Sequence, residues 1–219
     1  MQRQARGLVS GLFRRCPWTN QKWGASLQQE ASVSGISAPS PTQLGQVVKL
    51  DELITRDRAE VAEIWLGYHA DEKGGRVGSV LSADDYKTFI KRAKESPMFV
   101  FPMPKPHKGP GAYEAMLIQC QMPYVLITGL EEFKRHGEGA PPYLTLTHYA
   151  ELLDSHGLTL VRGDIIHEKG IARDEARTAL ELTRAFYCSD EDYALVHTFN
   201  HKPASFDFGA VLRKLKLQQ

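Results

Sequence analysis

Apolar residues recur at helical spacing in three long stretches of the chain. The first stretch follows Asp57, which together with Glu60 three residues later forms a capping-box pattern. The apolar positions that we expect on its buried face are Val61, Ile64, Trp65 and Tyr68. The second stretch, residues 83–95, follows Ser82 as a predicted N-cap, and the third, residues 171–188, is the longest. We therefore predict three amphipathic helices.

Short β-branched and aromatic runs lie between and after these helices. They predict strands at residues 98–101, 113–121, 124–128, 143–149 and 158–166. Only Met122 and Pro123 separate the second run from the third, which indicates an antiparallel hairpin. Four prolines between positions 102 and 110 exclude a helix or a central strand there, so we expect an exposed loop.

The final third of the chain supplies the remaining predicted elements. Shorter helices are expected at residues 130–136, 148–156 and 207–217. Residues 193–200 alternate in a way that predicts a last buried strand, which breaks at Asn200-His201-Lys202-Pro203. Several strands joined by short connections predict an α+β fold, a mainly antiparallel β-sheet packed with helices in a single domain.

The N-terminal segment differs in charge from the rest of the chain. Residues 1–48 carry five basic side chains and a single acidic one, Glu30. Leu8, Leu12 and Phe13 would share one side of a helix beside arginines, as in a mitochondrial presequence. Residues 31–46 are rich in Ser, Pro, Gly and Ala and indicate a flexible linker. We expect a presequence at 1–30, a linker at 31–46 and the folded domain at 47–219.

Composition narrows the class of protein. The formal net charge of +1 argues against a nucleic-acid-binding protein, which usually has a marked basic excess. No apolar run approaches the roughly 18 residues that a membrane helix needs, so we expect no membrane insertion. The three cysteines lack metal-ligand spacing and form no secreted disulfide pattern, which fits a reducing compartment.

Motifs for catalysis, metals and cofactors are missing from the sequence. There is no phosphate-binding loop, no nucleophile elbow and no H-E-x-x-H pattern. One alternative stays open, a small matrix enzyme with a His-centred site. It requires that several of four side chains converge in one pocket: His148, His167, Cys188 and His197. A Cys188–His197 nucleophile pair would be one form of it.

Several stretches together resemble the mitochondrial ATP synthase assembly factor 1 family. The two most specific are the core T-F-N-x-x-P-x-x-F, which starts at Thr198, and H-Y-x-E-L, which starts at His148. The matching pieces cover roughly residues 47–212 in the same order. The resemblance implies a non-enzymatic chaperone of the mitochondrial matrix, without cofactors or metals. It would bind the free catalytic beta subunit of ATP synthase and prevent its aggregation until the alpha subunit arrives.

Two further expectations concern the partner. We expect a monomer whose contact surface combines exposed apolar residues near residues 98–104 with the turn after the last predicted strand. The partner-binding residues predicted on this basis are Met98, Phe101, Met103, Asn200, His201, Lys202 and Phe206. Of these, Phe206 has the stronger claim to a core position because aromatic side chains are usually buried. A permanent accessory subunit of a respiratory complex is the remaining alternative.

Overall fold

A six-stranded antiparallel sheet forms the centre of the molecule in a computed structural model that describes residues 43–70 and 75–217. The strands are β1 (Arg76–Ser82), β2 (Met98–Pro104), β3 (Tyr113–Gln121), β4 (Tyr124–Gly129), β5 (Leu144–Tyr149) and β6 (Leu158–Ile165). Their order across the sheet is β1-β6-β5-β4-β3-β2, so β1 and β2 are the two edge strands. The predicted α+β fold with a mainly antiparallel sheet is confirmed.

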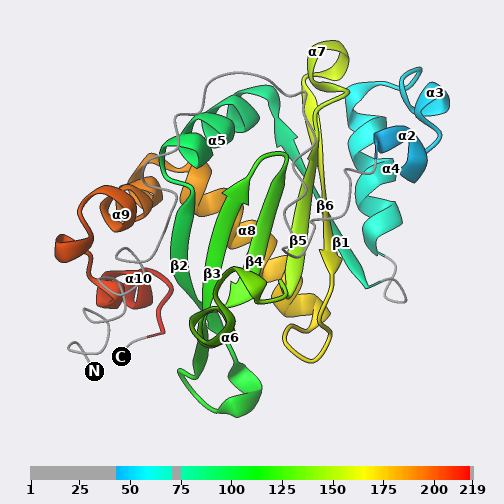
Figure 1. The fold of residues 1–219 in the computed structure, drawn as a ribbon. Helices are drawn as coiled ribbons and strands as arrows, with labels where there is room; N and C mark the ends of the chain where they lie inside the picture. Colours follow the sequence, from blue (N-terminus) through cyan, green and yellow to red (C-terminus); the bar gives the residue numbers. More distant parts are fainter. Residues whose placement is uncertain (1–42, 71–74, 218–219) are drawn as a thin grey trace.

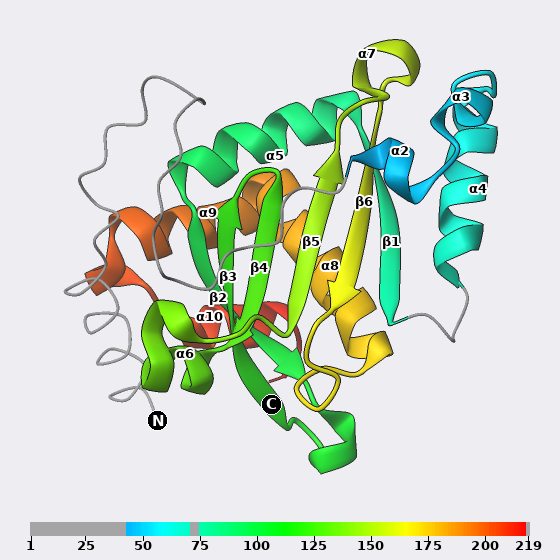
Figure 2. The same cartoon turned by 45° about the vertical axis from the view of Figure 1, so that its right-hand side comes forward.

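Helices pack on both faces of this sheet (Figures 1 and 2). The described helices are α2 (Leu44–Val47), α3 (Leu50–Leu53), α4 (Arg58–Ala70), α5 (Ala83–Glu95), α6 (Leu130–His136), α7 (Leu153–His156), α8 (Arg173–Cys188), α9 (Asp190–His201) and α10 (Phe208–Lys214). Short 3-10 turns lie at Pro106–Lys108, Gly137–Gly139 and Pro203–Ser205. The main core lies between the sheet and α5, α8 and α9, and includes Phe89, Phe99, Phe101, Phe186 and Tyr187.

A second, smaller core lies on the opposite face, under α4. Val61 and Trp65 of α4 pack there with Leu44 and with Leu160 of β6. The predicted capping box is confirmed, because Asp57 Oδ1 accepts from the Glu60 N–H at 2.9 Å and Glu60 Oε2 accepts from the Asp57 N–H at 3.3 Å. These contacts fix where α4 begins and which side of it meets the sheet.

The apolar stripe of α4 is narrower than the sequence pattern predicts. The buried row is Val61, Trp65 and His69, spaced four residues apart. Ile64 and Tyr68 are 47% and 48% exposed, so the prediction that they are buried is wrong. A single buried row covers the contact because α4 packs mainly on the edge strand β1 and much less on β6. The rest of the helix surface has no strand of the described chain beneath it.

Strand β1 is the element that the sequence pattern missed. Its residues contain Gly78 and two serines and do not alternate, so local propensity for a strand is weak. The strand forms because all seven residues pair with β6, about 80 positions later in the chain. Its position next to β6 places it at the edge opposite β2.

Two further boundaries differ from prediction. Leu44, the first residue of α2, is fully buried and its N–H donates to Glu151 Oε1 at 3.0 Å, so packing against the fold begins three residues before the predicted start of the domain. The helix expected at 148–156 is reduced to α7, because His148 and Tyr149 complete strand β5. The expected presequence and the first part of the expected linker lie outside the described residues.

Candidate functional site

The stretch Tyr193–Asn200 is helical, and the prediction of a strand there is wrong. It belongs to α9, whose N-cap is Ser189, with Ser189 Oγ accepting from the Asp192 N–H at 3.4 Å. Three consecutive acidic residues follow the cap, an arrangement that favours a helix start because it opposes the helix dipole. Val196 and Phe199, three residues apart, are its buried positions. The helical period therefore fits this segment better than the alternation does.

Asn200 joins the end of α9 to the edge strand β2. Cys120 N donates to Pro97 O, so residues 97 and 120 form a hydrogen-bonded pair of the β2–β3 ladder. Such pairs alternate along an antiparallel ladder, so the odd-numbered residues of β2 bond to β3. The even-numbered residues, of which Met98 is the first, direct their backbone N–H and C=O groups away from β3. The Asn200 Nδ2 donates to Met98 O at 2.6 Å, and its Oδ1 accepts from Met98 N at 3.3 Å. One side-chain amide thus takes the place that another strand would occupy.

Two prolines block the remainder of this edge. Pro102 and Pro104, like Met98, are at positions whose backbone groups point away from β3. Because proline has no N–H, neither can donate a hydrogen bond to another strand. The prediction of an exposed loop beginning at residue 102 is wrong, since β2 continues to Pro104 paired with β3. These prolines are compatible with the strand because it is an edge strand.

Burial removes three of the seven predicted partner-binding residues from the surface. Phe101 and Met103 are 0% and 1% exposed, so the expectation of exposed apolar side chains is wrong for both. Phe206 is 7% exposed and its ring lies 5.1 Å from that of Phe199, which confirms its core position. Phe99 completes this aromatic cluster. The T-F-N-x-x-P-x-x-F motif therefore serves mainly to attach α9 to β2.

The other four predicted residues differ in accessibility. Met98 and Asn200 are half-buried, and Asn200 is committed to the hydrogen bonds with Met98 and to one with Val196 O. His201 and Lys202 are exposed at the C-terminal end of α9. Of the predicted set, only these last two residues are exposed.

The H-Y-x-E-L motif also has a structural role. His148 is buried between the rings of Tyr86 and Phe89, and burial lowers its pKa to about 4. Tyr149 packs in the second core, and the Glu151 carboxylate holds the N-terminus of α2. The motif therefore connects the N-terminal helices to the sheet.

The four side chains required for a His-centred active site do not converge. His148 lies in the core, His167 contacts Tyr143, and His197 contacts Glu95 and His201. The Cys188 thiol bonds to Asp85 O, and burial raises its pKa to about 11, which keeps it protonated at neutral pH. No contact joins any two of the four within the described part of the chain, so the proposed Cys188–His197 pair is not formed.

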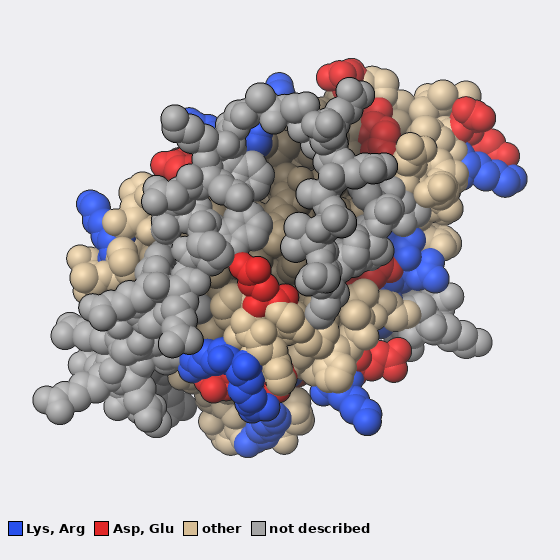
Figure 3. Space-filling model, in the orientation of Figure 1, with Lys and Arg blue, Asp and Glu red and all other residues tan. Residues whose placement is uncertain are grey.

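Charge does not single out a binding surface on the face seen in Figure 1. Acidic and basic side chains are interspersed over its described surface, and neither sign forms a continuous field (Figure 3). Ion pairs of the described chain such as Lys134 with Glu131 and Arg135 with Glu132 are local pairs, three residues apart on α6. Backbone groups and apolar side chains are therefore the more informative features.

The free edge of β1 offers such backbone groups. Ile165 N donates to Gly75 O and Ala83 N donates to Gly157 O. These two bonds, at the two ends of the β1–β6 ladder, show that the odd-numbered residues of β1 bond to β6. In an antiparallel ladder the intervening even-numbered residues then direct their N–H and C=O groups away from β6. Gly78 and Val80 occupy these outward positions in the middle of the strand. Unlike β2, this edge contains no proline.

A groove lined by α4, β1 and α8 runs along this edge, where Figure 2 shows α4 beside β1. We call it the β1 groove. One part has a volume of about 270 Å³ and is lined by Leu66, His69, Ala70, Val77, Gly78, Ser79, Arg177, Leu180 and Glu181. The adjoining part, about 440 Å³, is lined by Arg58, Ala59, Ala62, Val80, Ser82, Asp85, Leu158 and Arg184.

The groove has an apolar wall, and a buried polar atom beside it is unsatisfied. Leu66 of α4 is 46% exposed at its rim. His69 packs against Gly78 so closely that a Cβ at residue 78 would lie 2.6 Å from its ring, so glycine is required there. The His69 Nε2 has no hydrogen-bond partner within the described residues, and burial lowers the pKa of this ring. Sequence reasoning missed this site because it did not identify β1.

Candidate metal ligands occur at one place in the described residues. Glu95, His197 and His201 bring a carboxylate and two imidazoles together at the end of α9. None of the helices among residues 43–70 and 75–217 is long and apolar enough to cross a lipid bilayer.

Comparison with known proteins places the chain in a family. The model of the ATP11 protein family matches residues 18–212. The chain is 29% identical over 175 residues to the ATP synthase mitochondrial F1 complex assembly factor 1 of Danio rerio, covering 79% of this chain and 56% of that protein. It is 26% identical to the Homo sapiens protein of the same name over 79% of this chain and 51% of that protein. It is 28% identical to the mitochondrial protein atp11 of Schizosaccharomyces pombe, over 75% of this chain and 58% of that protein.

The chain thus spans about half the length of the curated relatives that it matches. The family model, in contrast, covers most of the chain, including every strand of the sheet and both sequence motifs. The chain belongs to the ATP11 protein family.

Proposed function

We propose that this protein is an assembly factor for the F1 part of mitochondrial ATP synthase, and that it acts in the matrix on the catalytic beta subunit. The observation that carries the proposal is the family match over residues 18–212, with relatives named as F1 complex assembly factors. The choice of the beta subunit rests on the motif resemblance. The partner would be bound before it pairs with the alpha subunit.

The physical chemistry of subunit assembly supports a chaperone of this kind. A subunit of an obligate complex exposes a large apolar interface until its partner arrives, and such surfaces aggregate. A protein that covers part of this interface lowers the concentration of aggregating species without catalysing a reaction. Its affinity has to be lower than that of the final partner, so a contact of moderate size suffices.

The β1 groove is the surface that we assign to this contact. The outward backbone groups of Gly78 and Val80 are those that an extended segment of the beta subunit would pair with, as an added strand. Leu66 provides an apolar contact on the α4 wall of the groove. The exposed pair His201 and Lys202 is a second, smaller candidate contact at the other end of the sheet.

Purified subunits test the partner. The chain should form a complex with free beta subunit, fail to do so with free alpha subunit, and be released when alpha is added to the complex. Equal binding of both subunits would contradict the choice of partner. Persistence of the chain at fixed stoichiometry in the finished enzyme would instead support an accessory subunit.

Two matched pairs of variants test the surface. Leu66→Asp places a charge on the rim of the groove and should weaken beta-subunit binding by more than about tenfold. Its control is Ile64→Asp, at nearly equal exposure on the other side of α4, which should change binding little.

Val80→Pro removes the outward backbone N–H that Val80→Ala retains, so only the proline variant should lose binding. Equal effects within either pair would exclude strand addition at β1.

A further inference from the structure

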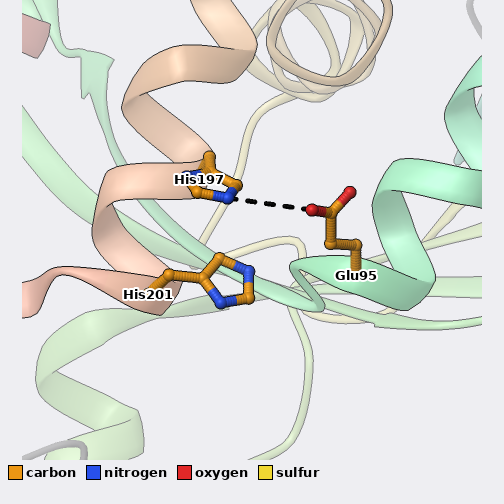
Figure 4. Close-up of side chains that lie close together, drawn as sticks. All are labelled: Glu95, His197 and His201. Carbon is orange, nitrogen blue, oxygen red and sulfur yellow. Dashed lines mark ion pairs between the residues drawn. The ribbon is translucent and has the colours of Figure 1, made fainter.

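Three potential metal ligands meet where α5 ends beside α9. Glu95 is the last residue of α5, and His197 and His201 are one turn apart on α9. One ligand atom from each lies within 4.8 Å of the other two, and the two imidazole rings are 4.4 Å apart. Figure 4 shows both rings on the same side of α9, with His197 facing the Glu95 carboxylate. The His197 Nε2 to Glu95 Oε1 distance is 3.7 Å.

The donor set and its spacing are those of a zinc site. Two histidines at i and i+4 on one helix face can bind the same ion, and a carboxylate from another element completes a three-ligand set. Zinc–ligand bonds are about 2.0–2.2 Å long, so ligand atoms approach one another more closely in an occupied site than here. The side chains at Glu95 and His201 are exposed and can make this adjustment by rotation.

Neighbouring groups already orient these ligands. The Tyr193 hydroxyl donates to Glu95 Oε2 at 3.1 Å and also contacts the Ser96 hydroxyl, at 3.0 Å. Ser96 is fully buried, and its Oγ lies 3.2 Å from His201 Nε2. Outer hydrogen bonds of this kind fix ligand orientation in metal sites. A bound ion would replace the Ser96–His201 contact and leave the Tyr193–Glu95 bond in place.

The positive charge of Arg92, which contacts Tyr193, is already paired. The Arg92 guanidinium lies over the Tyr193 ring at 4.5 Å, but it bonds to the Asp190 carboxylate and to Tyr187 O. Other exposed histidines of the described chain meet at most one carboxylate: His136 lies 3.5 Å from Glu132, and His107 lies 4.0 Å from Glu175. Those pairs lack a second imidazole, which makes His136 a suitable control.

We propose that Glu95, His197 and His201 bind a divalent transition metal ion, with Zn²⁺ as its probe, in a site with one open coordination position. The ion would connect α5 directly to the C-terminal end of α9. It would therefore stabilise the segment that holds Asn200 against β2. The site goes beyond the proposed function, since partner binding at the β1 groove does not require it.

Titration calorimetry of the metal-free full chain with Zn²⁺ tests the proposal. One equivalent should bind, and His197→Ala and Glu95→Gln should each weaken binding by more than about tenfold, whereas His136→Ala should leave it unchanged. Co²⁺ should give the visible absorption of a nitrogen- and oxygen-ligated ion, which the His197→Ala variant loses. Zn²⁺ should also raise the midpoint of thermal unfolding for wild type and not for His197→Ala.

Two results would overturn the site. Absence of Zn²⁺ binding at micromolar protein is one. The other is binding that persists in the double variant His197→Ala/His201→Ala, which would show that the ion is held elsewhere in the chain. Both histidines point outward from α9, and circular dichroism of each variant checks that the fold is retained.

Discussion

The two edge strands of the sheet differ in how their outward backbone groups are satisfied. At β2, Asn200 bonds to both backbone groups of Met98, and Pro102 and Pro104 have no N–H to offer. At β1, Gly78 and Val80 direct their backbone groups into a groove between α4 and α8. Natural sheets protect their edges against unwanted pairing, so an unprotected edge in a sheet whose opposite edge is protected indicates a place where pairing is useful.

The comparison also explains what the two sequence motifs do. Both lie in packed regions: one attaches α9 to the protected edge, and the other connects α2 and α4 to the sheet. A motif shared with a family is often interpreted as a binding site, but these two motifs hold helices against the sheet. The surface that we assign to the partner has no motif, because backbone groups of any sequence can pair with a strand.

The largest expected effect is at the aromatic cluster behind the protected edge. Phe206→Ala removes a 7% exposed ring that packs on Phe199 and Phe99, and should lower the free energy of unfolding by about 3–5 kcal/mol. Urea unfolding followed by circular dichroism measures this loss. Phe208→Ala, at a half-buried ring, is the control and should cost clearly less. Equal losses would show that the cluster does not anchor this edge.

Acid should destabilise the core between the two edges. Burial holds the pKa of His148 at about 4 in the folded state, below the unfolded value of about 6.5. Between these two pH values the imidazole is protonated in the unfolded chain and neutral in the folded one, so protonation favours unfolding. Stability is therefore greatest above pH 6.5 and falls as the pH drops toward 4, by up to about 3 kcal/mol from this residue. The lowered pKa of His69 at the β1 groove acts in the same direction.

Urea unfolding at several pH values between 7.5 and 4.5 measures this dependence. His148→Gln removes the titrating ring and should flatten the slope in that range. An unchanged slope in the variant would mean that His148 does not carry the effect.

Removing the Asn200 amide should open the protected edge. Asn200→Ala leaves Met98 N and O without these partners and should cost about 2 kcal/mol, with increased self-association at high protein concentration. Asn200→Asp keeps an acceptor for Met98 N and loses the donor for Met98 O, so its effect on stability should differ from that of alanine. Light scattering that shows no association of Asn200→Ala would indicate that Pro102 and Pro104 suffice to block β2.

The smallest expected effect is at the exposed turn after α9. Lys202→Glu should leave stability unchanged and lower beta-subunit affinity by only about two- to threefold, as expected of a charge at the rim of an interface. Surface plasmon resonance should show this change in the association rate. If Lys202→Glu abolishes binding while Leu66→Asp does not, the partner uses the β2 end of the molecule instead of the β1 groove.

Much of the fold follows from local sequence signals. The caps at Asp57 and Ser82, the hairpin around Met122 and the long helix α8 are set by side chains close to one another in the chain. The two errors in element type, α9 and β1, have different causes. At α9 the local signals were present, namely the cap at Ser189 and the helical spacing of Val196 and Phe199, but the alternation of residues 193–200 obscured them. Strand β1, in contrast, is decided by pairing with β6, about 80 positions later in the chain.

The candidate site was less predictable than the fold for the same reason. The phase of β1, and hence the outward direction of Gly78 and Val80, depends on its register with β6. The alternation of apolar residues around Phe101 and Met103 indicates a strand but does not show which helices cover it. Only the packing of α8 and α9 shows that these side chains are core.

Amide hydrogen exchange of the chain with and without the beta subunit tests the central claim most directly. In the free chain the outward amides of Gly78 and Val80 should exchange faster than those of their neighbours Val77 and Ser79, which bond to β6. Addition of the beta subunit should protect residues 76–82 and leave residues 98–104 unchanged. Protection confined to residues 98–104 or to the end of α9, with β1 unaffected, would contradict the assignment of the partner to the β1 edge.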